Sequence, residues 1–252
     1  MPSSLSTQYK KQYKWRDWAT VFKLVPPLNK CTVLDLGCGI GDQTALLSQR
    51  GASVIGIDQD SELLEQARKK NILNSRFIEA NIADLSKLGL PKIDGIWCSF
   101  TAAYFPNIGQ PLKSWLKHLK PGGWLAITEM SGLLNHSPLS IQTQSAIQGF
   151  YQLLFDKNLY DFNMGENIEK TINSLSLKLE QKVLLKDKEL SQDGKLSKDV
   201  IAAWENRLER MKGLQNYLGD KFNEFKEEFI ACLNRKDHIS SCFVYFYLIK
   251  CR

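Results

Sequence analysis

The chain has 252 residues, 43% of them hydrophobic, so it is long enough to bury one large core. No apolar run approaches the roughly 20 residues that a membrane-spanning helix needs, and residues 1–7 are short and polar, unlike a secretory signal. The net charge of +6 comes from cations interleaved with acids, which does not favour a nucleic-acid partner. We therefore expect a cytoplasmic protein with no membrane segment.

Strand and helix patterns alternate along the first half of the chain. Such alternation is typical of parallel strands joined by right-handed helical crossovers. Helical patterns cover residues 42–51, 61–71 and 111–119. Buried-strand patterns cover residues 31–37, 52–58, 75–81, 93–100 and 123–130. The predicted fold class is therefore α/β, with a doubly wound sheet.

The flanking segments are richer in helical patterns. We predict a basic, aromatic helix over 8–25, a polar helical stretch over 131–165, a sixth strand in 177–190, helices near 197–212 and 214–234, and a last strand in 241–250. No repeat or Pro/Gly-rich linker separates them. We therefore expect one domain over 1–252, in which 31–130 form the core and 8–25, 131–165 and 197–234 form a helical cap.

Three alternate glycines, Gly37, Gly39 and Gly41, follow the first strand and leave almost no side chain on the turn. A triphosphate-binding loop would need the pattern GxxxxGK[ST], which is absent. A dinucleotide fingerprint, GxGxxG, would need a third glycine where Asp42 or Thr44 stands. The turn therefore favours a ligand without a pyrophosphate.

Two carboxylates narrow the range of possible ligands further. Asp35, two residues before the first glycine, would repel a pyrophosphate but suits an ammonium group. Asp58 ends the second strand and is placed to accept hydrogen bonds from ribose hydroxyls. A cofactor with a ribose, a cation and no phosphate is indicated, and S-adenosylmethionine fits that description.

The stretches VLDLGCGIGDQTALLSQRGASVIGID, FIEANIADL, IDGIWCSF and LKPGGWLAITE resemble, in order and spacing, the motifs of class I S-adenosylmethionine-dependent methyltransferases. The resemblance covers about residues 31–130. It implies a Rossmann-like sheet, mostly parallel, of seven strands with the last antiparallel. It also implies that S-adenosylmethionine is the cofactor.

The resemblance assigns roles to individual positions. It places the methionine part of the cofactor against the backbone of the glycine turn, supported by one acid, and the ribose and adenine against the ends of the second and third strands. Asn81 stands where many relatives have an acid, which makes that adenine contact a departure from the pattern. The residues implied are Asp35, Gly37, Cys38, Gly39, Asp58, Gln59, Asn81, Ile82, Ser99 and Phe100.

Several acceptor classes are disfavoured. The Asn/Asp-Pro-Pro-aromatic tetrapeptide of enzymes that methylate base amines is replaced here by SFTAAYF, residues 99–105. Cys98 lies inside a strand pattern and is better explained as a buried thiol than as a nucleophile. We expect no metal site, because the six cysteines form no CxxC pair and no ligand cluster is evident.

Three side chains are candidates for the acceptor chemistry. Glu129 ends the fifth strand and could attract a cation, or could be a solvated carboxylate. His136 could deprotonate a hydroxyl or an ammonium group, or could be an ordinary surface-loop histidine. Tyr104, after the fourth strand, could line the acceptor pocket. His238 is expected to be exposed.

The N-terminal segment offers two further contacts. Its aromatic side chains could simply fix the segment to the sheet. Alternatively, as in many relatives, it could close over the cofactor, with Tyr13 and Arg16 meeting the cofactor carboxylate.

The sequence therefore predicts methyl transfer from S-adenosylmethionine to an amine or hydroxyl of a small-molecule metabolite, with the amine slightly favoured. An RNA or protein methyltransferase, and a cofactor-binding module without catalysis, are the alternatives.

Overall fold

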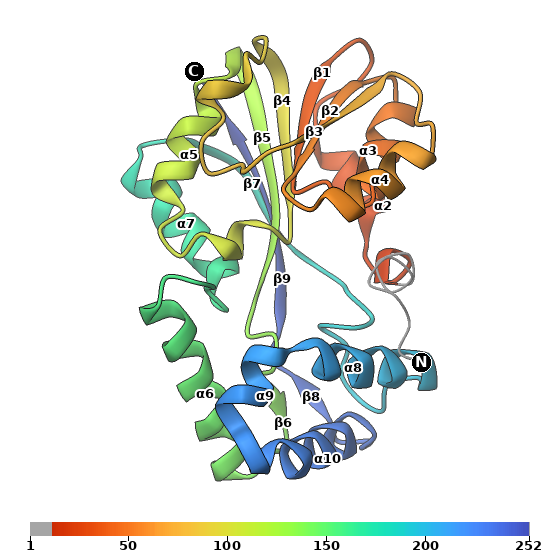
Figure 1. Cartoon of the computed structure of the whole chain (residues 1–252), viewed down its shortest axis with the longest axis vertical. Coiled ribbons are helices and arrows are strands. Elements are labelled where there is room, and N and C mark those ends of the chain that lie inside the picture. The colour runs from red at the N-terminus through yellow and green to blue at the C-terminus, as the bar shows by residue number, and fades with distance from the viewer. Residues whose placement is uncertain (1–11, 252) are drawn as a thin grey trace.

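The main sheet of the computed structural model, which describes residues 12–251, has seven strands in the order β3-β2-β1-β4-β5-β9-β7. All run parallel except β9, which is antiparallel to both of its neighbours. The predicted sheet is confirmed (Figure 1). The strands are β1 (Thr32–Leu36), β2 (Ser53–Asp58), β3 (Ser75–Glu79), β4 (Ile93–Ser99), β5 (Leu119–Ser131), β7 (Lys178–Leu185) and β9 (Phe243–Lys250).

The central strands are buried on both faces because helices cover both. In β1, Val33 belongs to a core that also contains residues of α2 and α3, whereas Leu34 and Leu36 pack in a second core with residues of α5 and α7. Two-sided burial explains why the strand is apolar at nearly every position instead of alternating. The helices of this half are α2 (Trp18–Leu24), α3 (Asp42–Gln49), α4 (Ser61–Lys69), α5 (Gly109–Leu116) and α7 (Met164–Ser174), with short 3-10 turns η1 (Ser86–Leu88) and η2 (Ala102–Tyr104).

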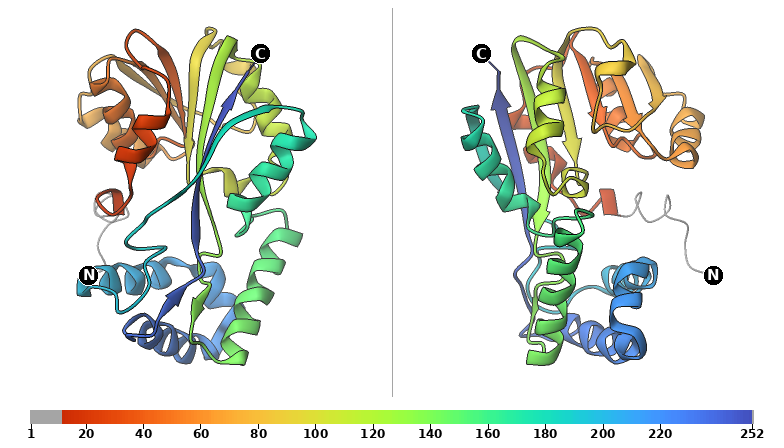
Figure 2. Two further views of the ribbon diagram at one scale, coloured as in Figure 1. Left: turned by 180° about the vertical axis from the view of Figure 1, so that it is seen from behind. Right: turned by 60° about the vertical axis from the view of Figure 1, so that its left-hand side comes forward.

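A second group of elements, which we call the helical lobe, lies beyond the carboxyl ends of the strands (Figures 1 and 2). It consists of α6 (Ile141–Asp156), α8 (Lys198–Arg210), α9 (Lys212–Leu218), η3 (Gly219–Lys221) and α10 (Phe222–Leu233), with a small sheet of β6 (His136–Ser137) and β8 (Ile239–Ser240). The long strands β5 and β9 connect the lobe to the main sheet, as both views in Figure 2 show.

The helical lobe differs from the prediction in three places. The helix predicted over 214–234 is divided at Gly219, which has a φ of +54° and ends α9. The strands β6 and β8, of two residues each, are too short to give a sequence pattern. The helix predicted over 197–212 ends earlier, because α8 stops at Arg210 and α9 already begins at Lys212.

The predicted helix 8–25 is also only partly present. Gln12 and Tyr13 are helical, and after a turn α2 begins at Trp18, where the side chain of Asp17 caps it by accepting a hydrogen bond from the backbone N–H of Thr20. Before the cap, Arg16 forms an isolated β-bridge with Asp187. Residues 8–11 of the prediction lie outside the described residues.

Within residues 12–251, no helix combines the length and the apolar character that crossing a lipid bilayer requires.

Candidate functional site

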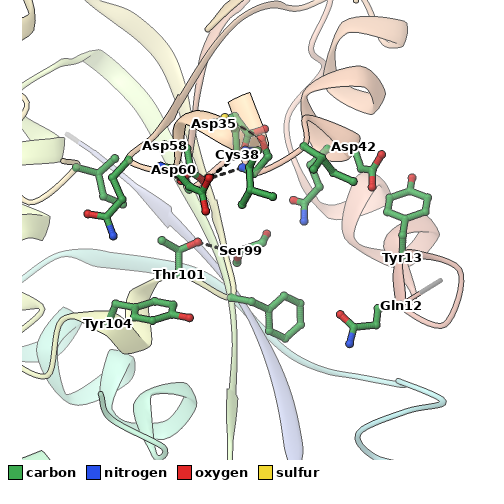
Figure 3. A pocket seen from close by; sticks show the side chains of 18 of the residues that line it. Gln12, Tyr13, Asp35, Cys38, Asp42, Asp58, Asp60, Ser99, Thr101 and Tyr104 are labelled. Carbon is green, nitrogen blue, oxygen red and sulfur yellow. Dashed lines mark hydrogen bonds between the residues drawn. The ribbon is translucent and has the colours of Figure 1, made fainter. Parts of the chain in front are cut away.

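A cavity of about 570 Å³ opens at the carboxyl ends of β1 to β4, where the strand order reverses between β1 and β4. Such a reversal is where open α/β sheets form their ligand crevice. All twelve predicted cofactor-binding residues line it, and so does Tyr104 (Figure 3). The twelve are Tyr13, Arg16, Asp35, Gly37, Cys38, Gly39, Asp58, Gln59, Asn81, Ile82, Ser99 and Phe100.

The glycine turn forms the floor of the cavity. Gly37 has a φ of +71°, and a Cβ there would lie 2.2 Å from Oγ1 of Thr101, so this position requires glycine. The backbone N–H groups of Gly37 and Cys38 both donate to the carbonyl of Ile57, at 2.8 and 3.2 Å. The turn is therefore fixed to β2 before any ligand binds.

The carboxylate of Asp58 is held at the rim of the turn. Its Oδ2 accepts from the N–H of Gly39 at 2.8 Å, and its Oδ1 accepts from the N–H of Asp60 at 3.0 Å (Figure 3). A carboxylate offers about four lone-pair positions, so both oxygens can still accept hydrogen bonds from a ligand. This arrangement suits a pair of ribose hydroxyls.

Asp35 lies deeper, 2% exposed, and its Oδ2 accepts a hydrogen bond from Oγ1 of Thr44 at 2.6 Å. Burial raises the pKa of this carboxyl to about 7, although the bond from Thr44 opposes the shift. Near neutral pH, Asp35 is therefore poised between its neutral and ionised forms. A cationic group in the cavity would favour the ionised form.

The end of the cavity next to β3 includes Asn81, the side chain that departs from the family pattern. Oδ1 of Asn81 accepts from the N–H of Ala83 at 2.8 Å, which leaves its amide nitrogen to donate to a ligand. Next to it, the carbonyl of Ile82 accepts from Nε1 of Trp115 at 2.6 Å, which fixes the backbone after β3.

The opposite wall comes from the N-terminal segment. The guanidinium of Arg16 lies over the ring of Phe100, with its Cζ 4.3 Å from the ring centre. Burial, and then the nearby Asp42, raise the pKa of Tyr13 to about 12, so its hydroxyl stays protonated and can donate a hydrogen bond at neutral pH. Tyr13, which is labelled in Figure 3, and Arg16 therefore line the same cavity as the glycine turn.

Glu129 does not line the cavity. It is fully buried, and its Oε2 accepts from the N–H of Ala103 at 3.1 Å while its Oε1 accepts from the N–H of Met130 at 3.0 Å. Burial raises the pKa of this carboxyl to about 7, against the effect of these hydrogen bonds. The side chain therefore supports η2, which carries Tyr104, and does not line the cavity.

His136 does not line the cavity either, and it is no surface residue. It lies in β6, buried among Trp204, Phe229 and His238 of the helical lobe. His238, expected to be exposed, is 1% exposed. Neither position could be predicted, because the partners of these histidines are remote in sequence.

The two histidines form a hydrogen-bonded pair. Nδ1 of His136 lies 2.9 Å from Nε2 of His238, and Nδ1 of His238 lies 2.8 Å from the carbonyl of Gly194. Because the carbonyl can only accept, we assign the proton of His238 to Nδ1 and the shared proton to His136. Nε2 of His136 is then left buried without a partner.

Tyr104 lines the cavity, is 60% exposed, and meets the ring of Tyr160 edge-on at 5.0 Å between centres. Ten further lining residues were not predicted from the sequence. Most are direct neighbours in sequence of predicted ones, and that adjacency was the available signal. They are Gln12, Trp18, Ile40, Asp42, Gln43, Asp60, Leu63, Ala80, Thr101 and Phe105.

Across the part of the chain that the structure describes, no three His, Cys, Asp or Glu side chains gather as metal ligands would.

The chain is similar to a family model, to curated relatives and to solved structures. The family model described as a methyltransferase domain matches residues 33–123. A trans-aconitate 2-methyltransferase of Deinococcus radiodurans is 35% identical over 106 residues, which is 41% of this chain and 40% of the relative. The chain thus matches less than half the length of this curated relative.

Two solved structures share the fold. One is an S-adenosylmethionine-dependent methyltransferase from Mesorhizobium loti, with a TM-score of 0.55 and 16% identity over 93% of this chain and 97% of that one. The other is a phosphoethanolamine N-methyltransferase 2 of Haemonchus contortus, in complex with phosphomonomethylethanolamine and S-adenosylhomocysteine. It has a TM-score of 0.55 and 16% identity over 99% of this chain and 53% of that one.

Proposed function

The chain belongs to the class I S-adenosylmethionine-dependent methyltransferases, and we propose that it transfers a methyl group from S-adenosylmethionine to an amine or hydroxyl of a small-molecule acceptor. S-adenosylhomocysteine would be the second product. One observation carries the proposal: residues predicted from the family motifs at four separate strand ends line a single cavity.

The ribose and adenine would occupy the end of the cavity formed after β2 and β3. Asp58 would accept from both ribose hydroxyls with the lone pairs that Gly39 and Asp60 leave open. Gln59 and Ile82 would border the adenine, and the amide nitrogen of Asn81 would donate to it.

The methionine part would lie over the glycine turn. Its ammonium group would be attracted by Asp35, and its carboxylate would meet the hydroxyl of Tyr13 and the guanidinium of Arg16. Ser99 and Phe100, at the end of β4, would then border the sulfonium. S-adenosylmethionine supplies an already activated methyl group, so the protein mainly has to align the acceptor and exclude water.

The acceptor would enter beside Thr101, Tyr104 and Phe105, which line the cavity next to Phe100. Among the described lining residues there is no histidine to deprotonate a hydroxyl. A neutral amine is nucleophilic enough to attack the sulfonium methyl before it loses a proton, whereas a hydroxyl first has to give its proton to a base. For this reason we favour an amine over a hydroxyl.

Of the three predicted cap segments, only the N-terminal one contributes to the lining of the cavity among the residues that the structure describes. We propose that 31–130 hold the cofactor, and that 131–165 and 197–234 act on the site through contacts with other segments.

A methyl-transfer screen tests the proposal. Purified protein is incubated with S-adenosylmethionine labelled in its methyl group and with panels of amines, amino acids, phenols and carboxylic acids, and the products are identified by mass spectrometry. Labelled product from an amine is the expected result. Label found only in added RNA or protein would overturn the small-molecule assignment.

A further inference from the structure

Residues 12–17 form one wall of the cavity and precede helix α2 in the chain. The position of this wall depends on contacts with other segments. The segment that holds it is 186–190, between β7 and the helical lobe. The N–H of Lys188 donates to the carbonyl of Trp15 at 3.1 Å, and Arg16 forms a β-bridge with Asp187.

Side chains add to this attachment. Nε2 of Gln12, which lines the cavity, donates to Oε1 of Glu189 at 3.0 Å. Arg16 is held more loosely, since its Nε lies 3.4 Å from Oδ2 of Asp187 and its Nη2 lies 4.0 Å from Oε2 of Glu189. Glu189 therefore lies behind two side chains that face the cofactor cavity, without lining the cavity itself.

Glu189 is also fixed from the other side by the helical lobe. Its Oε1 accepts from Nη2 of Arg207 at 2.6 Å, and its backbone carbonyl accepts from Nε1 of Trp204 at 3.0 Å. Both partners belong to α8, and the carboxylate itself is fully buried. A buried carboxylate depends strongly on its partners, so movement at α8 would be transmitted to Gln12.

We propose that Glu189 is a positioning residue that holds the 12–17 wall closed over the cofactor and thereby couples the helical lobe to cofactor affinity. The inference rests on the proposed function, because it takes the cavity to be the cofactor site. The wall is attached by few hydrogen bonds, and such segments open at low free-energy cost. Glu189 thus limits how often the wall opens, while the glycine turn determines what binds.

The test uses two variants that weaken the attachment from opposite sides. Glu189→Gln removes the charge, and Gln12→Met removes only the hydrogen-bond donor while keeping a side chain of similar length. Exposed Glu205 is on the same helix as Arg207, and Glu205→Gln provides the matched control. S-adenosylhomocysteine affinity is measured by calorimetry, and opening of the wall by the rate at which trypsin cleaves after the exposed Lys14.

We expect both variants to bind S-adenosylhomocysteine about tenfold more weakly, as loss of a hydrogen bond to a charged group implies. Cleavage after Lys14 should be faster in both, and saturating ligand should slow it in the wild type. The KM for S-adenosylmethionine should rise, while kcat at saturating cofactor stays unchanged, which a general loss of structure would not produce. Glu205→Gln should match the wild type.

If Glu189→Gln fails to fold, Gln12→Met carries the test, because it leaves the pair between Glu189 and Arg207 intact. Unchanged affinity and unchanged cleavage in the folded variants would overturn the inference while leaving the proposed function in place. Failure of the wild type to bind S-adenosylhomocysteine would instead refute the proposed function.

Discussion

The two walls of the cavity are held in place by different forces. The inner wall, the glycine turn with Asp35 and Asp58, is fixed by short-range backbone hydrogen bonds at the ends of buried parallel strands. The outer wall, residues 12–17, is fixed by contacts with residues more than 170 positions away, such as Gln12 with Glu189.

The two walls therefore have different roles in cofactor binding. The inner wall is formed before the ligand arrives, so it can determine which cofactor binds without a cost of reorganisation. The outer wall has fewer contacts and can determine how tightly the cofactor is enclosed. Perturbing the inner wall should therefore have larger effects on cofactor affinity than perturbing the outer wall or the helical lobe.

The largest effect is expected from Asp58→Ala. The change removes the proposed ribose contacts and also the acceptor for the N–H groups of Gly39 and Asp60. We expect S-adenosylhomocysteine to bind about a hundredfold more weakly, because two charge-assisted hydrogen bonds are lost. Calorimetry measures this, with Asp220→Ala at an exposed acid as the control. A loss of less than threefold would contradict our assignment of the ribose.

A smaller and more selective effect is expected from Glu129→Gln. The glutamine has one acceptor oxygen for two buried backbone donors, those of Ala103 and Met130, so one of them loses its partner at a cost of about 1–3 kcal/mol. The turn η2 and Tyr104 should shift. We expect kcat/KM for the acceptor to fall about tenfold, with S-adenosylhomocysteine affinity unchanged.

Steady-state kinetics and calorimetry on the same preparation separate these two effects, and Glu224→Gln at an exposed site serves as the control. If the variant lost cofactor affinity and acceptor turnover equally, Glu129 would not act through η2.

The pH dependence of cofactor affinity tests Asp35. In the free protein its pKa is raised to about 7, so below pH 7 the carboxyl is mostly protonated and must lose its proton when a cationic ligand binds. Affinity for S-adenosylhomocysteine should therefore increase by up to about tenfold between pH 6 and pH 8.

Calorimetry in two buffers of different ionisation enthalpy should detect proton release at pH 6 that disappears by pH 8. Asp35→Asn should bind more weakly and without this pH dependence. Affinity that decreased with rising pH would count against the placement of the ammonium group beside Asp35.

The smallest effect on the cavity is expected from His136, which acts on stability alone. Burial, and then the neighbouring His238, lower the pKa of His136 to about 3. Between that value and the ordinary pKa of about 6.5, the unfolded chain binds a proton that the folded protein does not. Protonation of His136 in the unfolded chain therefore does not affect the free energy of unfolding above about pH 7. As the pH falls, it lowers that free energy by about 1.4 kcal/mol per unit between roughly pH 6 and pH 4.

The raised pKa values of Asp35 and Glu129 act in the opposite direction over much of the same range, since there the folded protein binds the extra proton. The informative quantity is therefore the difference between wild type and His136→Leu in urea unfolding at pH 7 and pH 5. The wild type should lose stability relative to the variant on acidification. Parallel changes in the two proteins would show that His136 does not titrate as proposed, and cofactor affinity at pH 7 should be equal in both.

The same contrast between the walls explains how much could be predicted from sequence. The strands, the glycine turn and Asp58 follow from local patterns, because a buried parallel strand and the turn after it are encoded within about ten residues. Asn81 and Ser99 were placed by the resemblance to the family motifs near the ends of the third and fourth strands. All of them line the cavity.

Residues whose partners are distant in sequence could not be predicted in this way. Glu129 was predicted to attract a cation, or to be a solvated carboxylate, because its position near the end of β5 does not show that η2 packs over it. The surroundings of His136 depend on α8 and α10, about seventy and ninety residues further along the chain. The hydrogen bond between Gln12 and Glu189 corresponds to no local sequence pattern.

The most direct test of the account is a crystal structure of the protein with S-adenosylhomocysteine bound. We predict that both ribose hydroxyls lie within hydrogen-bond distance, about 2.5–3.0 Å, of the carboxylate of Asp58, with the amino group next to Asp35 and the carboxylate facing Tyr13 and Arg16. A ligand bound in the reverse orientation, or with its ribose away from Asp58, would contradict the account.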